Sequence, residues 1–144
     1  KAANTYRQVQ VQTAAKDDLL GLLLDGGVRF SEGALIELKK GEDEDLEKRN
    51  DYLIRSQKIL LELMGALSPA IGLETYDSLQ RLYKFTFQRL FEGNLDADIE
   101  KVREGAVMFK QIRDMWAEAI VKAKSEAKQR PERPSSGSSL SVQG

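Results

Sequence analysis

The apolar positions of the chain recur with the period of an α-helix in four long segments. In the second segment the recurrence is every seventh residue and is marked by four leucines: Leu46, Leu53, Leu60 and Leu67. The predicted helices cover about residues 17–40, 43–67, 75–92 and 96–127. Only residues 9–13 alternate between apolar and polar side chains, and such a short stretch does not build a sheet. The pattern therefore predicts an all-α fold, an antiparallel four-helix bundle.

Residues that cap or end helices set the boundaries between these segments. Gly41 follows two lysines at the end of the first helix, which is a usual way for a helix to end. Gly93 and Asn94 predict the end of the third helix, and Asp96 is a suitable N-cap for the fourth. Residues 68–72 contain a proline and a glycine and predict a loop.

The two ends of the chain differ from the bundle in composition. We expect the segment before residue 16 to form a fifth element, a short helix or an arm that lies across the bundle. This element either covers one end of the core permanently or is a movable cover that a partner displaces. Residues 128–144 are rich in serine, proline and glycine, and they predict a disordered tail, native or a linker. The predicted division is a bundle domain of residues 1–127 and a tail of residues 128–144.

Composition narrows the class of protein. The chain has 144 residues, 41% of them apolar and 31% charged, as expected for one soluble globular domain. Its 22 basic and 23 acidic side chains give a net charge of −1, which argues against a protein that coats nucleic acid. No run of about 18 apolar residues occurs, so we expect no membrane insertion.

Histidine and cysteine are both absent from the chain. Their absence excludes thiol nucleophiles, cysteine–histidine zinc sites and imidazole acid–base catalysis. Carboxylate-bridged metal sites of four-helix bundles need Glu-x-x-His pairs, so this chemistry is excluded as well. We predict a protein that is not an enzyme and that holds no cofactor and no metal.

Two of the predicted helices carry more apolar positions than a core stripe requires. In the second helix, Ile54 and Leu61 lie about 90° to one side of the core stripe. In the fourth helix, a second stripe consists of Met108, Ile112, Met115 and Ala119. Deep burial of both helices or a homodimer accounts for this surplus, and so does a hydrophobic groove for the amphipathic helix of a partner.

The first predicted helix is unusually rich in glycine. Gly21, Gly26, Gly27 and Gly33 each cost about 1 kcal/mol relative to alanine inside a helix, so a compensating role is expected. Close packing against neighbouring helices is one such role. A shallow groove left open for another chain is the other.

Several motifs, taken in order, resemble those of a known family. Residues 3–14 read ANTYRQVQVQTA, residues 25–30 read DGGVRF, and residues 113–120 read RDMWAEAI. Together with the pattern of residues 79–94, these motifs resemble the flagellin export chaperone family FliS over residues 3 to about 121. The chain departs from the family where Ala15 and Lys16 replace Ser-Pro and where Leu24 replaces a tyrosine.

The resemblance implies a cytoplasmic bacterial chaperone. Such proteins bind the disordered C-terminal segment of flagellin, prevent its premature polymerisation and aid its delivery to the flagellar type III export apparatus. It also implies the export-gate protein and other flagellar regulators as further partners, and it makes Tyr6 an expected contact. The candidate partner-binding residues are Tyr6, Ile54, Leu61, Met108, Ile112 and Met115.

Two alternatives remain open from the sequence. The first is a structural or adaptor bundle that self-associates, for example as a homodimer, through its extra apolar stripes. The second, weaker one is an RNA-binding bundle that uses the basic end of the fourth helix, which contains Lys122, Lys124 and Lys128.

Overall fold

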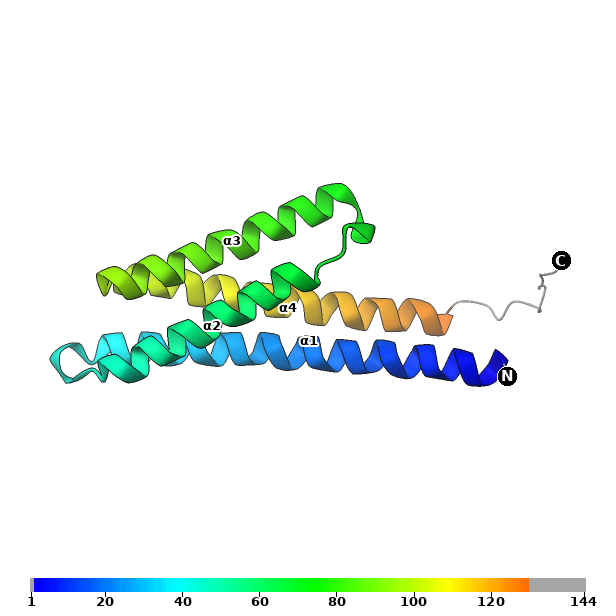
Figure 1. The fold of residues 1–144 in the computed structure, drawn as a ribbon, viewed down its shortest axis with the longest axis horizontal. Helices are drawn as coiled ribbons and strands as arrows, with labels where there is room; N and C mark the ends of the chain where they lie inside the picture. Colours follow the sequence, from blue (N-terminus) through cyan, green and yellow to red (C-terminus); the bar gives the residue numbers. More distant parts are fainter. Residues whose placement is uncertain (1, 130–144) are drawn as a thin grey trace.

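Four α-helices form an antiparallel bundle in the computed structural model, which describes the backbone of residues 2–129 and the side chains of residues 15–129 (Figure 1). The helices are α1 (Ala2–Lys39), α2 (Leu46–Ala66), α3 (Leu73–Asp96) and α4 (Ile99–Gln129). Two short 3-10 helices, η1 (Gly41–Asp43) and η2 (Pro69–Ile71), lie in the loops on either side of α2. The described residues contain no strand, and the predicted all-α four-helix bundle is confirmed.

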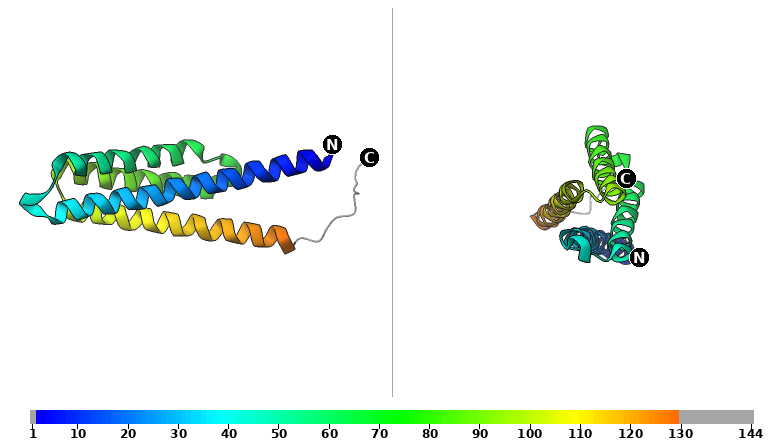
Figure 2. Two further views of the ribbon diagram at one scale, coloured as in Figure 1. Left: turned by 90° about the horizontal axis from the view of Figure 1, so that it is seen from below. Right: turned by 90° about the vertical axis from the view of Figure 1, so that its left-hand side faces the viewer.

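Each helix packs against two neighbours. α1 and α3 each contact both α2 and α4, and the end-on view in Figure 2 shows the four helices around a common core. At one end of the molecule α1 and α4 run past the ends of α2 and α3 (Figure 1). We call this the open end. The opposite end, where the α1–α2 and α3–α4 loops lie, is the closed end.

The first helix differs from the prediction. A separate arm or short helix before residue 16 was expected, but α1 is one continuous helix of 38 residues that begins at Ala2. Ala15 and Lys16 explain the continuity, because a proline at this point would restrict the residue before it and remove a backbone hydrogen bond. At the other end of the chain, α4 includes Lys128 and Gln129, so the helix extends two residues beyond the predicted boundary. The predicted disordered tail otherwise lies outside the described residues.

The core consists of apolar side chains from all four helices. Tyr83 and Phe109 are the largest of them and are fully buried. Two glycines of α1 permit close packing: a Cβ at Gly27 would lie 2.0 Å from the Phe109 ring, and a Cβ at Gly33 would lie 2.9 Å from the Tyr52 ring. Close packing is therefore the role of these two glycines.

The closed end is tied together by buried charged groups. The Arg49 guanidinium on α2 donates hydrogen bonds to both carboxylate oxygens of Glu44, and to the side-chain oxygen and the carbonyl oxygen of Asn94 on α3, the latter two at 3.3 Å. The Glu37 carboxylate on α1 accepts hydrogen bonds from the Lys40 ammonium at 2.8 Å and from the Asp45 backbone N–H at 3.0 Å. These bonds lower the pKa of Glu37, the one from Lys40 most strongly.

The connection between α3 and α4 also differs from the prediction. Gly93 does not end α3 but lies within the helix. Its role is in packing, because the absence of a side chain lets Val102 of α4 approach it closely. The helix continues to Asp96 and is followed by its C-cap Ala97, which has a left-handed backbone with a φ of 51°. Asp98, and not Asp96, caps α4: its side-chain oxygen accepts the backbone N–H groups of Glu100 and Lys101 at 3.0 and 3.2 Å.

Candidate partner-binding surface

Two hydrogen bonds between α2 and α3 fix how these helices lie side by side. The Asn94 side-chain amide donates to the Asn50 side-chain oxygen at 2.8 Å, and the Gln80 side-chain amide donates to the Met64 carbonyl at 2.9 Å. Because the helices are antiparallel, this register places Leu61 level with Tyr83. The side chains near these two hydrogen bonds line the outer side of the α2–α3 junction.

An exposed apolar surface follows this junction. On α2, Ile54 and Leu61 lie within about 40° of Asn50 around the helix, at 100° per residue. On α3, Phe87 and Phe91 lie within about 20° of Gln80. The exposed fraction is 40% for Ile54, 54% for Leu61 and 51% for Phe91. With the exposed leucines at the closed end, these side chains form what we call the α2–α3 strip: Leu46, Ile54, Leu61, Phe87, Phe91 and Leu95.

Two further features of the strip are a stacked pair of aromatic rings and a hollow at its closed end. The rings of Phe87 and Phe91 are stacked with centroids 6.4 Å apart, so each restricts the other. Near Leu46 and Leu95 the surface forms a hollow of about 440 Å³, which Arg49 and Asn94 also line. An apolar strip of this kind, about 22 Å long from Leu46 to Leu61, matches the length of a helix of about 15 residues.

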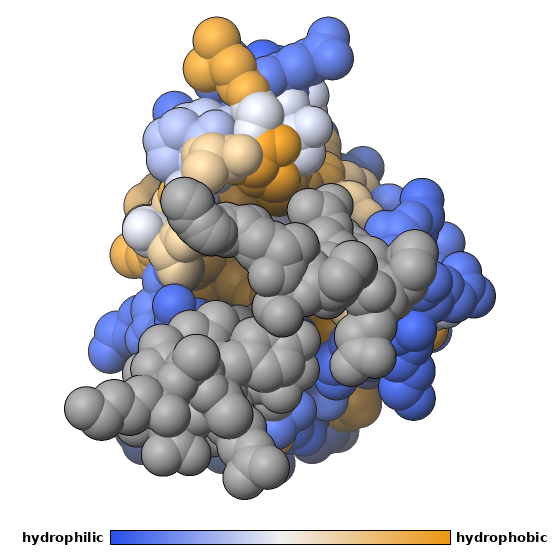
Figure 3. Space-filling model, turned by 90° about the vertical axis from the view of Figure 1, so that its right-hand side faces the viewer, coloured by the Kyte–Doolittle hydropathy of each residue, from blue (hydrophilic) through white to orange (hydrophobic). Residues whose placement is uncertain are grey.

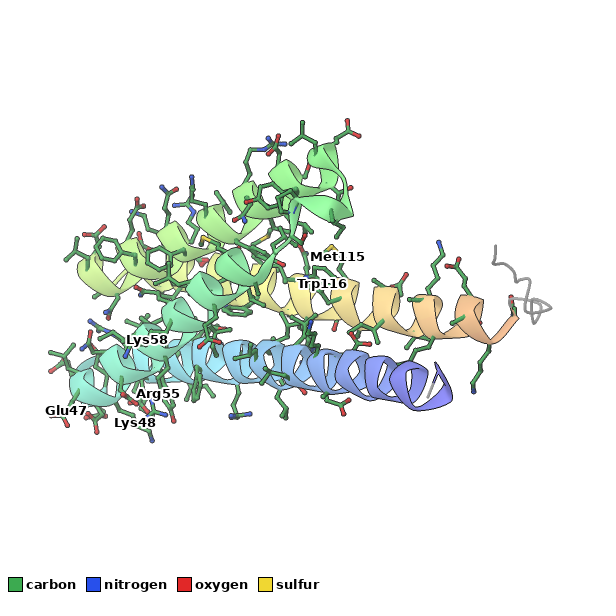
Figure 4. The ribbon with its side chains drawn as sticks, turned by 45° about the vertical axis from the view of Figure 1, so that its right-hand side comes forward. Glu47, Lys48, Arg55, Lys58, Met115 and Trp116 are labelled. Carbon is green, nitrogen blue, oxygen red and sulfur yellow. The ribbon has the colours of Figure 1, made fainter. Side chains whose placement is uncertain are left out.

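A second, smaller apolar surface lies on the other side of α3. The Arg89 side chain of α3 contacts Glu104 of α4 at 2.8 Å and stacks over the Phe85 ring, which is itself exposed. Met108 and Met115 follow Glu104 along the same edge of α4, and Figure 4 shows Met115 on the side of α4 that faces α3. Met108 is half-buried, and 39% of Met115 is exposed. We call Phe85, Met108 and Met115 the α3–α4 edge.

Ile112 does not belong to this surface. It was predicted to contact a partner together with Met108 and Met115, but its side chain has an exposed fraction of 0% and lies in the hydrophobic core. The reason is its direction around α4: Ile112 lies about 60° from Met115, towards the centre of the bundle. The prediction for Ile112 is therefore wrong, because a buried core residue offers no contact surface.

A cavity of about 410 Å³ lies at the open end, and all four helices line it. Leu19 and Leu23 of α1 and Leu63 of α2 form part of its apolar wall. At its inner side the Trp116 indole N–H donates a hydrogen bond to the Tyr83 hydroxyl at 2.8 Å. Burial raises the pKa of Tyr83, and this hydrogen bond acts in the opposite direction. Figure 3 shows the molecule from this end, with apolar surface between hydrophilic flanks.

The side chains of these surfaces offer mainly apolar contact. Among the described residues, no group of three or more histidine, cysteine, aspartate or glutamate side chains is placed to hold a metal ion. In the same part of the chain, none of the helices combines the length and hydropathy of a membrane span. The shifted pKa values of Glu37, Lys40 and Lys101 arise from ion pairs at the closed end, away from the open-end cavity.

The structure separates the predicted contact residues into groups. Ile54 and Leu61 lie on the α2–α3 strip, and Met108 and Met115 lie on the α3–α4 edge on the opposite side of α3. Tyr6 belongs to α1, but its side chain is outside the described ones. The sequence analysis missed the aromatic half of the strip, although Phe87 and Phe91 are one helical turn apart on the same face.

These features define a class of protein: a small helical bundle that presents exposed apolar surfaces suited to binding another polypeptide. Residues 1–124 match the family described as flagellar protein FliS, and the chain belongs to this family of flagellar secretion chaperones.

Curated relatives support this assignment over most of their length. The flagellar secretion chaperone FliS of Bacillus subtilis is 31% identical over 125 residues, which cover 87% of this chain and 88% of the relative. The FliS protein of Campylobacter jejuni is 28% identical over 117 residues, covering 81% and 89% of the two chains. FliSB of Pseudomonas aeruginosa is 26% identical over 123 residues, covering 81% and 93%.

Proposed function

We propose that this protein is a cytoplasmic, non-enzymatic chaperone that binds the disordered C-terminal segment of flagellin. It prevents premature polymerisation of flagellin and aids its delivery to the flagellar type III export apparatus, with the export-gate protein as a further partner. The observation that carries the proposal is the α2–α3 strip. This strip aligns five exposed apolar side chains and the half-buried Phe87 along a helix–helix junction, as a site for an amphipathic helix requires.

A client that folds on binding suits this surface. The two apolar surfaces lie on opposite sides of α3, so a flexible chain reaches both, whereas one rigid helix covers a single side. Ordering the client consumes part of the interaction free energy, and the complex therefore stays releasable for export. Methionine at the α3–α4 edge adapts its shape to the side chains of the client.

The test compares two surface variants with a matched control. Leu61→Asp places a charge on the α2–α3 strip, and Met115→Asp places one on the α3–α4 edge. Val107→Asp changes a residue of similar exposure on α4 that belongs to neither surface. Calorimetry with the C-terminal segment of flagellin from the same bacterium measures affinity, and thermal melts report the fold. We expect Leu61→Asp to weaken binding at least about tenfold, because a charge is desolvated in an apolar contact.

The alternative function is self-association through the same surfaces. Light scattering of the protein with and without the flagellin segment distinguishes the two. For a chaperone, the molar mass of the protein alone is that of a single species, and it increases by the mass of the client when the flagellin segment is added. If the protein forms dimers that Leu61→Asp disrupts while the flagellin segment does not bind, the adaptor function replaces our proposal.

A further inference from the structure

The charged residues along the margins of the α2–α3 strip are distributed unevenly. At the closed end the margin on α2 carries Glu47 and Asp51. Towards the open end the margins carry three cations, Lys58 on α2 and Arg81 and Lys84 on α3, against two carboxylates, Glu62 on α2 and Asp77 on α3. Glu47 and Lys58 are separated by about 16 Å along α2, and Figure 4 shows them at different levels of that helix.

The lysines stand on opposite margins of the strip. Around α2, Lys58 lies about 40° beyond Ile54 on the solvent side. Around α3, Lys84 lies about 20° from Phe91 on its solvent side. The register set by the Asn50–Asn94 contact places Lys58 and Lys84 within about one helical turn of the same level. A helix that lies on the strip therefore passes between two ammonium groups.

These cations are available to a partner. Lys58, Arg81 and Lys84 are exposed, and none of them forms an ion pair with any side chain of residues 15–129. The neighbouring Arg55 is different, because it pairs with Asp51 at 3.0 Å and lies over the Phe30 ring on the α1 side.

We propose that this charge asymmetry fixes the direction of the bound helix. The occupant is an amphipathic helix with acidic side chains in its C-terminal half, and it runs parallel to α2 with its N-terminus at the closed end. The negative C-terminal end of such a helix and its carboxylates then lie beside Lys58 and Lys84, and its positive N-terminal end lies beside Glu47. Because α2 and α3 are antiparallel, their helix dipoles oppose each other and favour neither direction of the bound helix. The charged side chains therefore determine which direction is preferred. This proposal rests on the proposed function, in which the strip binds a client helix.

The test uses two designed 16-residue peptides with the same composition and the same apolar face. One carries lysines in its N-terminal half and glutamates in its C-terminal half, and the other has the charges exchanged. Each is made with a dansyl group at either end and contains no tryptophan. Trp116 is the only tryptophan of the chain, and its indole N–H donates a hydrogen bond to Tyr83. Tyr83 is level with Leu61, the strip residue nearest the open end. Energy transfer from Trp116 therefore reports which end of the peptide lies at the open end.

We expect the peptide with C-terminal glutamates to bind about five- to tenfold more tightly at low salt, since several exposed ion pairs contribute. A dansyl group at its C-terminus should quench Trp116 more than one at its N-terminus. The double variant Lys58→Glu/Lys84→Glu should remove or invert both preferences. Its matched control, Lys110→Glu/Lys124→Glu, makes the same change in net charge on α4 and should keep them.

Equal affinities together with equal transfer from both ends would overturn the proposed direction, and so would a failure of both peptides to bind. Neither result touches the proposed function, which stands or falls with binding of the flagellin segment to the unmodified protein. If the flagellin segment fails to bind while the peptides show the expected preference, the strip has a directional helix site whose client is another protein.

Discussion

Gly27 lies beneath the ring of Phe109, and a Cβ at this position would come within 2.0 Å of that ring. The glycine thus sets the distance between α1 and α4. Gly21, six residues earlier on the same helix, has nothing within 4 Å of the corresponding position. The two residues have the same intrinsic cost in a helix but opposite roles, and only the structure distinguishes them.

Substitution by alanine separates these roles. Gly27→Ala should destabilise the protein by about 1–3 kcal/mol, because the buried Phe109 ring has to move away from the new methyl group. Gly21→Ala should stabilise it by about 0.5–1 kcal/mol, because alanine favours the helix and meets no obstacle. Urea unfolding measures both values. A stabilising Gly27→Ala would show that the α1–α4 contact is looser than described.

Glu37 gives the closed end a pH dependence. The Lys40 ammonium and the Asp45 N–H lower the pKa of this carboxyl below its ordinary value of 4.5. The unfolded chain therefore binds the proton more readily than the folded protein does. The stability that Glu37 contributes is fully present above about pH 4.5 and is lost as the pH falls through the lower folded pKa.

The variant Glu37→Gln tests this dependence. At pH 7 it should be less stable than the unmodified protein, and the difference should shrink as the pH falls from about 5 to about 3. Urea unfolding at several pH values provides the measurement. A difference that stays constant over this range would mean that the loss comes from packing and not from the carboxylate charge.

At the scale of the element, much of the fold could be predicted from sequence periodicity. All four helices were found, because each carries a continuous apolar stripe. Single residues that often end helices were less informative. Gly93 was predicted to end the third helix, but it permits the close contact with Val102. Only the α2 half of the α2–α3 strip was predicted, because the other half depends on contacts between helices that are distant in sequence. Ile54 and Leu61 stood out against a polar face, whereas only the register between α2 and α3 brings Phe87 and Phe91 beside them.

The continuity of α1 depends on the residues at positions 15 and 16. Lys16→Pro restores the proline of the family pattern and should interrupt the helix there. The segment before it, too short to be stable as an isolated helix, should then lose helical structure. Circular dichroism should show a smaller ellipticity at an almost unchanged melting temperature, since this segment extends beyond α2 and α3 (Figure 1). Lys16→Ala is the control and should keep the full ellipticity. An unchanged ellipticity in Lys16→Pro would mean that the segment is helical independently of α1.

At the scale of the whole molecule, the two ends of the bundle are built differently. The closed end holds the Arg49–Glu44–Asn94 network, the capping of α2 by Asp45 and the capping of α4 by Asp98. Near the open end, the described residues form the cavity, the Trp116–Tyr83 hydrogen bond and the Gln80–Met64 hydrogen bond. Conformational adjustment to a client therefore costs least at the open end, where few polar contacts have to break.

Because α1 and α4 are neighbours in the bundle, the fold does not require the helices to follow one another in their present order along the chain. The described ends of the first and last helices lie at the same end of the molecule (Figure 1), and these helices pack against each other as α1 and α2 do. A linker from Gln129 back to Ala2, with the chain opened at the η2 loop, would give the order α3, α4, α1, α2 without changing any neighbour. The bundle is thus a cyclic arrangement, and it should tolerate circular permutation at this loop.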